Sequence, residues 1–372
     1  MPIPLNDLKR TYSSNAAAFE EAVLATMRSG WWLNGGRAHD FCNAFASYVG
    51  VKHCVGVANG TDALEIAMRA LVATRCAGRG EAITVPNAGG YSAIAMHQLH
   101  LTPVYADIDP TSQLASQTSI LSALTPQTAF VVITHLYGNV FDVPSLRKEM
   151  DALGFPHVAI MEDCSQAHGA KLGDRMVGSF GDVATFSFYP TKNLGAFGDA
   201  GAIVTRDDAL AEDCEALRQY GWRSKYEIAR PNGRNSRLDE IQAAILSVQL
   251  PHLDHANQRR VAILDRYEAA VPSSIRIARG PKGSVAHLAV LLCDDRDGLR
   301  DHLNQIGVAT DIHYPILDCD QAGWRDHLMK EAPGGLANAR NSVIRLLTVP
   351  CFPTMREEEI DAVCQGLASW KA

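Results

Sequence analysis

The residues best suited to covalent chemistry lie in the segment Phe186–Gly201, which reads FSFYPTKNLGAFGDAG. Its lysine, Lys192, stands among small and aromatic residues rather than in a run of charges. A lysine that is desolvated in this way has a lowered pKa and a nucleophilic amine. We therefore predict that Lys192 is a covalent anchor, although the segment taken alone also fits a surface lysine.

An acidic residue ends an apolar run upstream of this lysine. The segment Ile160–Ala170 reads IMEDCSQAHGA, so Asp163 would lie at the end of a buried strand. In a cleft, its carboxylate could pair with a protonated ring nitrogen; the simpler alternative is a solvated turn aspartate. Just beyond it, Gln166 could hydrogen-bond a ring hydroxyl. His168 is typical of a structural histidine but could also touch a cofactor or substrate.

A phosphate site is predicted where a strand meets a helix at residues 59–62, which read NGTD. A helix N-terminus offers unpaired N–H groups and a partial positive charge, and both favour an anion. Gly60 lets the backbone approach closely, Thr61 adds a hydroxyl, and Ser187 could add another from a second strand end. The alternative is an ordinary N-cap that satisfies only the helix itself.

These residues must be positioned by alternating strands and helices. Helices are expected at residues 16–29, 39–49, 63–73, 239–249 and 253–271. Strands are expected at residues 54–58, 82–85, 102–106, 130–135, 158–161, 185–188, 201–205 and 286–292. Strands that are apolar on both faces and alternate with helices indicate a mostly parallel sheet between helical layers. Ligands of such sheets bind at the carboxyl ends of the strands, where the candidate residues fall.

We expect two domains. Pro251 interrupts the pattern, so residues 1–250 would form a large domain and residues 251–372 a smaller α/β domain at the C-terminus. Residues 1–35 would lie near the entrance of the active site. The lengths agree with a chain of 372 residues.

Composition excludes several classes of function. The net charge of −7 and the lack of a basic run argue against nucleic-acid binding. Nine scattered cysteines without a CxxC pair fit reduced thiols rather than a disulfide framework or a metal site. No signal peptide or apolar run long enough to cross a bilayer is present in the sequence, so we expect a cytoplasmic protein without membrane association.

Taken together, the phosphate turn, the acid and the lysine are what a pyridoxal 5′-phosphate site needs. The sequence resembles the DegT/DnrJ/EryC1/StrS family of sugar aminotransferases over nearly its whole length. The resemblance rests on GVANGTDAL, PVYADID, HLYG, EDCSQAHGA, FSFYPTKNLGAFGDAGAIVT and GRNSRLDEIQAAIL, which begin at residues 56, 103, 135, 162, 186 and 233. It implies an α/β three-layer sandwich of the fold-type-I aspartate aminotransferase kind with a smaller C-terminal domain.

The resemblance also implies roles for single residues. Lys192 would form the Schiff base with pyridoxal phosphate and later move the proton, while Asp163 would keep the pyridine nitrogen protonated. Gln166 would lie near the ring hydroxyl. The phosphate would be held by Gly60, Thr61 and Ser187, with Asn235 reaching it from the neighbouring subunit of a homodimer.

The sequence departs from the family pattern at two places. Where the family has an aromatic residue that stacks on the cofactor ring, this chain has Gly90, so Tyr91 is the candidate for stacking. In the segment IHYPILDCDQ, Cys319 stands where a histidine is usual. His313 and Tyr314 remain candidates for substrate contact. Trp31, Trp32 and Asn34 could also line the pocket or pack a helix–loop junction.

The implied activity is amino transfer in two half-reactions, with pyridoxamine 5′-phosphate as the intermediate form. L-Glutamate would be the amino donor and a dTDP- or UDP-linked ketohexose the acceptor, with C3 favoured over C4. Alternatives are a cyclitol ketone as acceptor and a dehydratase of the same fold. Lys192 argues against the dehydratase, because that branch carries histidine there. A non-catalytic regulatory protein that keeps the fold is a further alternative.

Overall fold

The computed structural model describes residues 2–76, 78–280 and 283–371. An eight-stranded sheet forms its centre, in the strand order β1-β9-β8-β5-β4-β2-β3-β14. β9 runs antiparallel to both neighbours, and all other paired strands are parallel. The strands are β1 (His53–Val57), β2 (Glu81–Thr84), β3 (Thr102–Tyr105), β4 (Thr128–Thr134), β5 (Ala159–Asp163), β8 (Val183–Ser187), β9 (Gly201–Thr205) and β14 (Lys330–Glu331).

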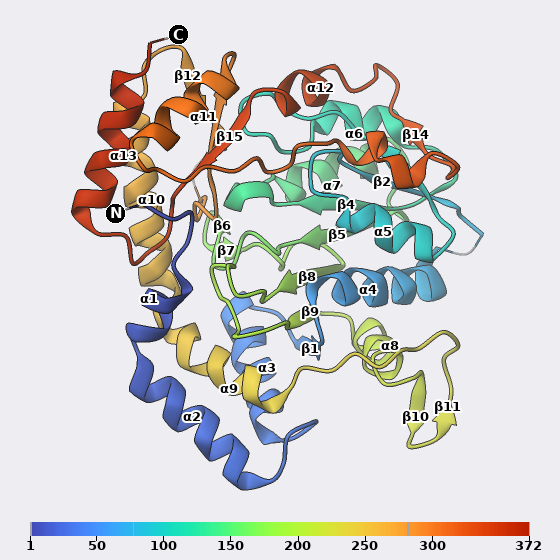
Figure 1. Cartoon of the computed structure of the whole chain (residues 1–372). Helices are drawn as coiled ribbons and strands as arrows, with labels where there is room; N and C mark the ends of the chain where they lie inside the picture. Colours follow the sequence, from blue (N-terminus) through green and yellow to red (C-terminus); the bar gives the residue numbers. More distant parts are fainter. Residues whose placement is uncertain (1, 77, 281–282, 372) are drawn as a thin grey trace.

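Helices cover both faces of this sheet (Figure 1). Both faces need this cover, because successive strand residues point to opposite faces and are buried on each. In β9, Ile203 packs with one helical layer, while Ala202 and Val204 pack with the other. The first layer contains α4 (Gly60–Arg75), α5 (Tyr91–Gln98) and α8 (Asp208–Leu217); the second contains α3 (Gly36–Val49), α6 (Gln117–Ala123), α7 (Val143–Ala152) and α9 (Glu240–Gln249). The predicted three-layer α/β sandwich is confirmed.

The C-terminal part builds a smaller antiparallel sheet, β12 (Ile275–Ile277), β13 (Ala289–Cys293) and β15 (Leu346–Val349). It shares one apolar core with α10 (Leu253–Ala270), α11 (Arg296–Gln305) and α13 (Glu357–Ser369). In contrast, β14 and α12 (Ala337–Val343) pack with the large sheet and its core. The division at residue 250 stays a prediction.

The N-terminal helices α1 (Leu8–Ser13) and α2 (Ala16–Ser29) lie along α9 and α10 (Figure 1). α2 has the predicted bounds, because Gly30 adopts a left-handed conformation (φ 68°) that ends the helix. Two hairpins complete the chain: β6 (Lys171–Leu172) with β7 (Arg175–Met176), and β10 (Trp222–Ser224) with β11 (Glu227–Ile228).

One predicted strand has the wrong start. The apolar pattern predicts a strand from residue 286, but β13 begins at Ala289. The N–H groups of Val285 and His287 instead donate to the carbonyls of Gly138 and Tyr137, at 3.0 Å each. These contacts hold the segment against the large sheet's loops, and it pairs with its own sheet only afterwards.

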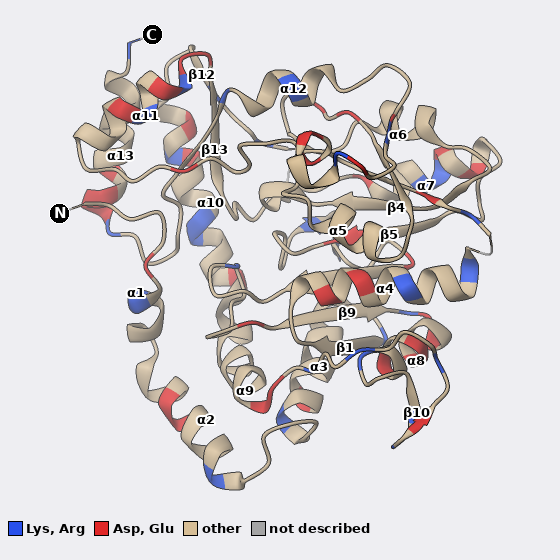
Figure 2. Ribbon diagram, turned by 45° about the vertical axis from the view of Figure 1, so that its right-hand side comes forward, with Lys and Arg blue, Asp and Glu red and all other residues tan. Residues whose placement is uncertain are grey.

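Charged residues of both signs are interspersed along α4 and α7, whereas the charged residues of α8 are all acidic (Figure 2). Among the described residues, no helix combines the length and apolar character needed to span a membrane.

Candidate active site

The carboxyl ends of the parallel strands bring the predicted residues to one edge of the large sheet. β5 ends at Asp163 and β8 at Ser187, while β1 is followed by the turn at Asn59–Thr61. β1 points the same way as β8, because both run antiparallel to the intervening β9. Ligand sites of open α/β sheets lie at this edge.

A cavity of about 450 Å³ opens at this edge, and we call it the lysine cavity. It is lined by nine of the predicted site residues: Gly60, Thr61, Tyr91, Asp163, Gln166, Ser187, Lys192, His313 and Tyr314. Residues more than 250 positions apart thus share one pocket. This volume is in the range of small-molecule and cofactor sites.

The start of α4 forms a cradle with no room for a side chain. A Cβ atom on Gly60 would lie 2.5 Å from the Cβ of Ser187 and 3.0 Å from its Oγ. Asn59 caps the helix, accepting a hydrogen bond of 2.8 Å from the N–H of Asp62. Gly60 and Thr61 therefore present the helix N-terminus directly to the cavity, beside the Ser187 hydroxyl, and this arrangement fits a phosphate group.

Asp163 is held by its own turn. Its side chain is buried, and its Oδ1 accepts a hydrogen bond of 3.1 Å from the N–H of Ser165. The backbone carbonyl accepts a further bond of 3.0 Å from the N–H of His135. The carboxylate is therefore fixed where it lines the cavity. There it can accept a hydrogen bond from a protonated ring nitrogen.

Lys192 extends from a tight loop after β8. Its backbone N–H donates to the Tyr189 carbonyl at 2.8 Å, and a Cβ on Gly195 would lie 2.5 Å from the Pro190 carbonyl oxygen, so the loop requires this glycine. Burial lowers the pKa of Lys192 from 10.5 to about 8, and the negative charge of Asp163 only partly opposes this shift. The amine is thus made more nucleophilic by its surroundings.

The amide of Gln166 has two partners within the protein. Its Oε1 accepts a hydrogen bond of 2.7 Å from the N–H of Tyr137, and its Nε2 donates to the Tyr314 hydroxyl at 3.0 Å. Tyr314 is in edge-to-face contact with Tyr91, with ring centroids 6.4 Å apart. Gln166 therefore fixes the position of Tyr314, and through it one side of the cavity.

Several further residues of the cavity wall have no individual role predicted from the sequence. They are Asn59, Leu64, Ala88, Thr134, Ser165, Tyr189, Thr191, Asp199, His287 and Leu288. The strand ends could have suggested Thr134, the last residue of β4. His287 gives no such signal, because it comes before its strand rather than after it.

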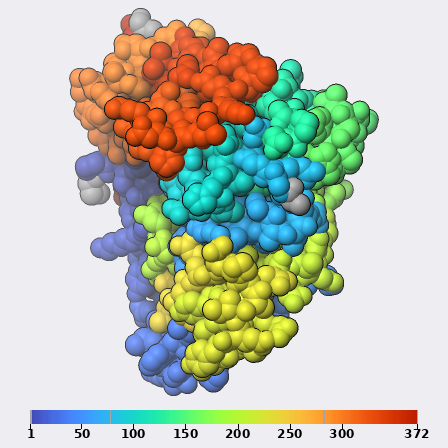
Figure 3. Space-filling view, turned by 90° about the vertical axis from the view of Figure 1, so that its right-hand side faces the viewer, coloured from blue at the N-terminus to red at the C-terminus, as the bar shows by residue number. Residues whose placement is uncertain are grey.

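Four predicted residues, Asn235, Trp31, Trp32 and Asn34, lie outside the lysine cavity of the single chain. Asn235 is exposed, and Trp32 is 59% exposed. Asn34 lines a separate hollow and hydrogen-bonds Gln219 at 3.1 Å. The segment from β10 to Asn235 lies at the surface (Figure 3). The roles expected of these residues stay predictions, and the role of Asn235 requires a second subunit.

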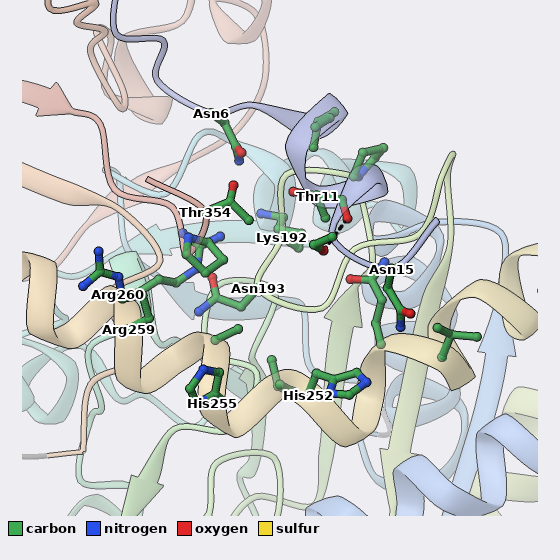
Figure 4. A pocket seen from close by; sticks show the side chains of 18 of the residues that line it. Asn6, Thr11, Asn15, Lys192, Asn193, His252, His255, Arg259, Arg260 and Thr354 are labelled. Atoms are coloured by element: carbon green, nitrogen blue, oxygen red, sulfur yellow. Dashed lines mark hydrogen bonds between the residues drawn. The ribbon is translucent and has the colours of Figure 1, made fainter. Parts of the chain in front are cut away.

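A second cavity, of about 550 Å³, meets the same loop; we call it the side cavity. Figure 4 shows Lys192 and Asn193 between the N-terminal segment and α10. Asn6, Thr11 and Asn15 contribute to its wall from residues 1–35. Their predicted place near the entrance stays a prediction.

Two buried histidines near the site, His168 and His135, are held by contacts within the protein. His168 packs against Phe186 and Phe188, and burial, with the nearby charge of Lys192, lowers its pKa to about 3. His135 accepts the Phe141 N–H at Nδ1 (3.1 Å), so its Nε2 carries the proton donated to Glu162 (3.0 Å).

Both carboxylate oxygens of Glu162 accept hydrogen bonds within the protein. Besides the bond from His135, the carboxylate accepts bonds from the N–H groups of Gly178, Phe180 and Gly181 at 2.7 to 2.9 Å. His135, Glu162 and Cys164 lie close enough together for a metal ion, but these hydrogen bonds occupy the carboxylate oxygens and both imidazole nitrogens. The cluster therefore braces the strand ends.

Comparison with known proteins identifies the family. The sequence profile of the DegT/DnrJ/EryC1/StrS aminotransferase family matches residues 13–368. The chain belongs to this family. The predicted resemblance is confirmed, and the chain is an aminotransferase of this family whose fold is that of the pyridoxal phosphate-dependent enzymes.

Individual members are similar over their whole lengths. The erythromycin biosynthesis sensory transduction protein EryC1 of Saccharopolyspora erythraea is 37% identical, covering 99% of both chains. A dTDP-3-amino-3,4,6-trideoxy-α-D-glucose transaminase of Streptomyces venezuelae is 36% identical over 99% of this chain and 96% of its own. The crystal structure of S. venezuelae DesV with a ketimine intermediate matches with a TM-score of 0.92 and 35% identity, covering 99% of this chain and 98% of DesV.

Pyridoxal phosphate is the cofactor of this fold, and the residues of the lysine cavity fit it. The open cradle at Gly60 has the shape and partial charge that a phosphate needs, and Asp163 is fixed beside the lysine. Among the described residues, no hydrogen bond occupies the Lys192 amine, which faces the same space. The site therefore offers an anchor for each end of the cofactor.

Proposed function

We propose that this aminotransferase moves an amino group from L-glutamate to the keto group of a dTDP- or UDP-linked ketohexose, with C3 favoured over C4. The observation that carries the proposal is that Lys192, Asp163 and the cradle of Gly60 and Ser187 line one cavity. The name of the S. venezuelae relative contains a dTDP-linked sugar with an amino group at C3, which supports this proposal. The reaction would serve amino-sugar biosynthesis.

The bound cofactor supplies an electron-withdrawing ring that stabilises negative charge at the reacting carbon. Asp163 would hold the proton on the ring nitrogen, and Gly60, Thr61 and Ser187 would bind the phosphate. Lys192 would anchor the cofactor covalently. The amine of the donor would take the place of Lys192 on the cofactor and so release Nζ. The freed Nζ would then take the proton from the α-carbon of the donor; the pKa of about 8 keeps a useful fraction of neutral amine near pH 7 to 8.

The remaining predicted residues would shape the substrate side. Tyr91 would stack on the cofactor ring, Gln166 would place its amide near the ring hydroxyl, and His313 and Tyr314 would contact the sugar. All four line the lysine cavity from outside the phosphate cradle.

We also propose that a homodimer completes the site, with Asn235, Trp32 and Asn34 acting from the neighbouring subunit. Large apolar side chains are exposed together near the end of α2: Leu24 at 45%, Met27 at 54%, Trp31 at 63% and Trp32 at 59%. A face of this composition is typical of an interface core. Asn235 itself is exposed and free to reach a partner.

A coupled assay tests this function. The protein is supplied with pyridoxal phosphate and L-glutamate and offered 3-keto and 4-keto nucleotide sugars and scyllo-inosose. Turnover of a 3-keto dTDP or UDP sugar is expected. Turnover of the cyclitol alone would contradict the substrate assignment, and dehydration without amine formation would favour the dehydratase.

A further inference from the structure

His287 occupies a place on the cavity wall that the proposed roles leave unassigned. It lies in the segment that precedes β13, where its backbone N–H donates to the Tyr137 carbonyl. Its side chain is buried, 6% exposed, and lines the lysine cavity together with Lys192 and His313. The imidazole thus borders the reaction space.

A chain of buried amides fixes which nitrogen of His287 carries hydrogen. Asn257 on α10 donates from Nδ2 to the His168 carbonyl at 2.8 Å. Its Oδ1 must therefore accept, and it accepts from Nδ2 of Asn193 at 2.7 Å. Asn193 Nδ2 also donates to the Val285 carbonyl at 3.2 Å. Because carbonyl oxygens can only accept, both amide orientations are determined.

The last member of this series of hydrogen bonds is the imidazole of His287. Asn193 Oδ1 is an acceptor and lies 2.8 Å from Nδ1 of His287, so Nδ1 must carry the hydrogen. In a neutral ring, Nε2 then has only its lone pair. Burial lowers the pKa of His287 well below 6.5, and the charges of Lys192 and Arg260 act in the same direction, so the ring stays neutral.

Other titratable groups near the ring do not reverse this state. His168 and His313 also lower the pKa of His287, and burial lowers the pKa of each of these two rings. Arg260 on α10 is itself buried and donates to the Cys351 carbonyl. His287 therefore offers the cavity a hydrogen-bond acceptor and no donor.

We propose that Nε2 of His287 accepts a hydrogen bond from a hydroxyl group of the ring ketone that receives the amine. This inference rests on the proposed function, and it names the acceptor side of the site. The lone pair of Nε2 needs a hydrogen-bond donor, and neither a carboxylate nor a keto oxygen is one. A sugar or cyclitol ring, in contrast, carries hydroxyl groups next to its ketone, and these can donate. His287 would then bind the acceptor without contributing to the glutamate half-reaction.

Two substitutions separate the functions of the two nitrogens. His287→Asn keeps an N–H near the position of Nδ1, for Asn193, but removes the acceptor in the cavity. His287→Gln keeps an amide oxygen near the position of Nε2 and loses the donor to Asn193. The two half-reactions are measured separately from the absorbance of the bound cofactor, with L-glutamate alone and then with the keto sugar that wild type accepts.

For His287→Asn we expect kcat/KM of the acceptor half-reaction to fall about five- to tenfold, the value of one hydrogen bond. The glutamate half-reaction should stay within about twofold of wild type, and His287→Gln should recover part of the loss. An unchanged acceptor half-reaction in His287→Asn would overturn the proposal. An equal loss in the glutamate half-reaction, or a shifted pH profile of it, would also overturn it, because His287 would then act on Lys192.

A measurement without catalysis tests the lone pair itself. The ¹⁵N resonances of histidine-labelled protein, assigned to His287 by their loss in His287→Asn, should show a neutral Nδ1–H ring from pH 5.5 to 8. An Nε2–H ring, or protonation near pH 6.5, would overturn the inference. If wild type fails to react with glutamate or any keto sugar, the proposed function fails and the hydroxyl contact falls with it, while the ¹⁵N spectra still decide the state of the ring.

Discussion

Gly60 and Ser187 approach each other so closely that a single methyl group on Gly60 would overlap the serine side chain. The added Cβ would lie 2.5 Å from the Cβ of Ser187. The two residues come from different strand ends, and the helix that Gly60 begins is capped independently by Asn59. The space between them is therefore a property of the tertiary fold and not of the turn alone.

Gly60→Ala should weaken pyridoxal phosphate binding by at least about tenfold, because the methyl group displaces Ser187 and blocks the helix N-terminus. The dissociation constant of the cofactor is measured by absorbance titration of the cofactor-free protein. Gly36→Ala is the matched control: it also lies in the first turn of a helix, and an added Cβ meets nothing within 4 Å. Equal affinity of Gly60→Ala and the control would remove the cradle from the phosphate site.

Lys192→Met should stabilise the cofactor-free protein near pH 7 while abolishing amino transfer. The folded state holds the pKa of Lys192 at about 8, below 10.5. Between these pH values the unfolded chain binds more protons, so wild-type stability rises with pH there. Below pH 8 the penalty of the buried charge is fully present, and we expect a difference of roughly 1 to 3 kcal/mol in favour of the variant.

Urea unfolding at several pH values between 7 and 10.5 checks this prediction. The advantage of Lys192→Met should be largest at pH 7 and shrink as the pH rises through 8 towards 10.5. Other titrating groups are common to both proteins and cancel in the difference. A difference that does not vary with pH would show that the lysine is not desolvated.

Asn235→Ala should weaken cofactor binding from the neighbouring subunit. Hybrid dimers of Asn235→Ala with Lys192→Ala test this directly. If the two residues act in different subunits, a hybrid dimer contains one site with both residues intact and one with neither. High-affinity cofactor binding should then return on mixing, to at most one site per hybrid dimer. No recovery in verified hybrids would place Asn235 in its own chain's site or in none.

The strand ends of the large sheet could be predicted from the sequence because their chemistry is local. Asp163 and Ser187 each follow an apolar run, and parallel strands place such ends along one edge. Lys192 joins them because its loop follows directly after β8. The alternation of strands and helices also predicted the fold class. It placed the ends of most strands within one or two residues of their bounds in the structure.

The part of the cavity wall that comes from the C-terminal part of the chain, such as His287, could not be predicted from the sequence in this way. His287 is positioned by the Tyr137 carbonyl and by Asn193, which lie 150 and 94 residues upstream, and no periodic pattern encodes such contacts. The same contacts delay the start of β13 to Ala289. Asn235 was predicted from resemblance, and Trp32 and Asn34 were predicted as possible pocket residues. A single chain does not bring any of the three to the lysine cavity.

Lys192 should carry the cofactor and release it to an amino donor. Purified protein with pyridoxal phosphate is reduced with borohydride before and after incubation with L-glutamate, and its peptides are analysed by mass spectrometry. We predict that the peptide containing Lys192 gains one reduced pyridoxyl-phosphate group before incubation and loses most of this label after it. Labelling of another lysine, or labelling of Lys192 that L-glutamate does not diminish, would show that Lys192 does not carry the cofactor and release it in this way.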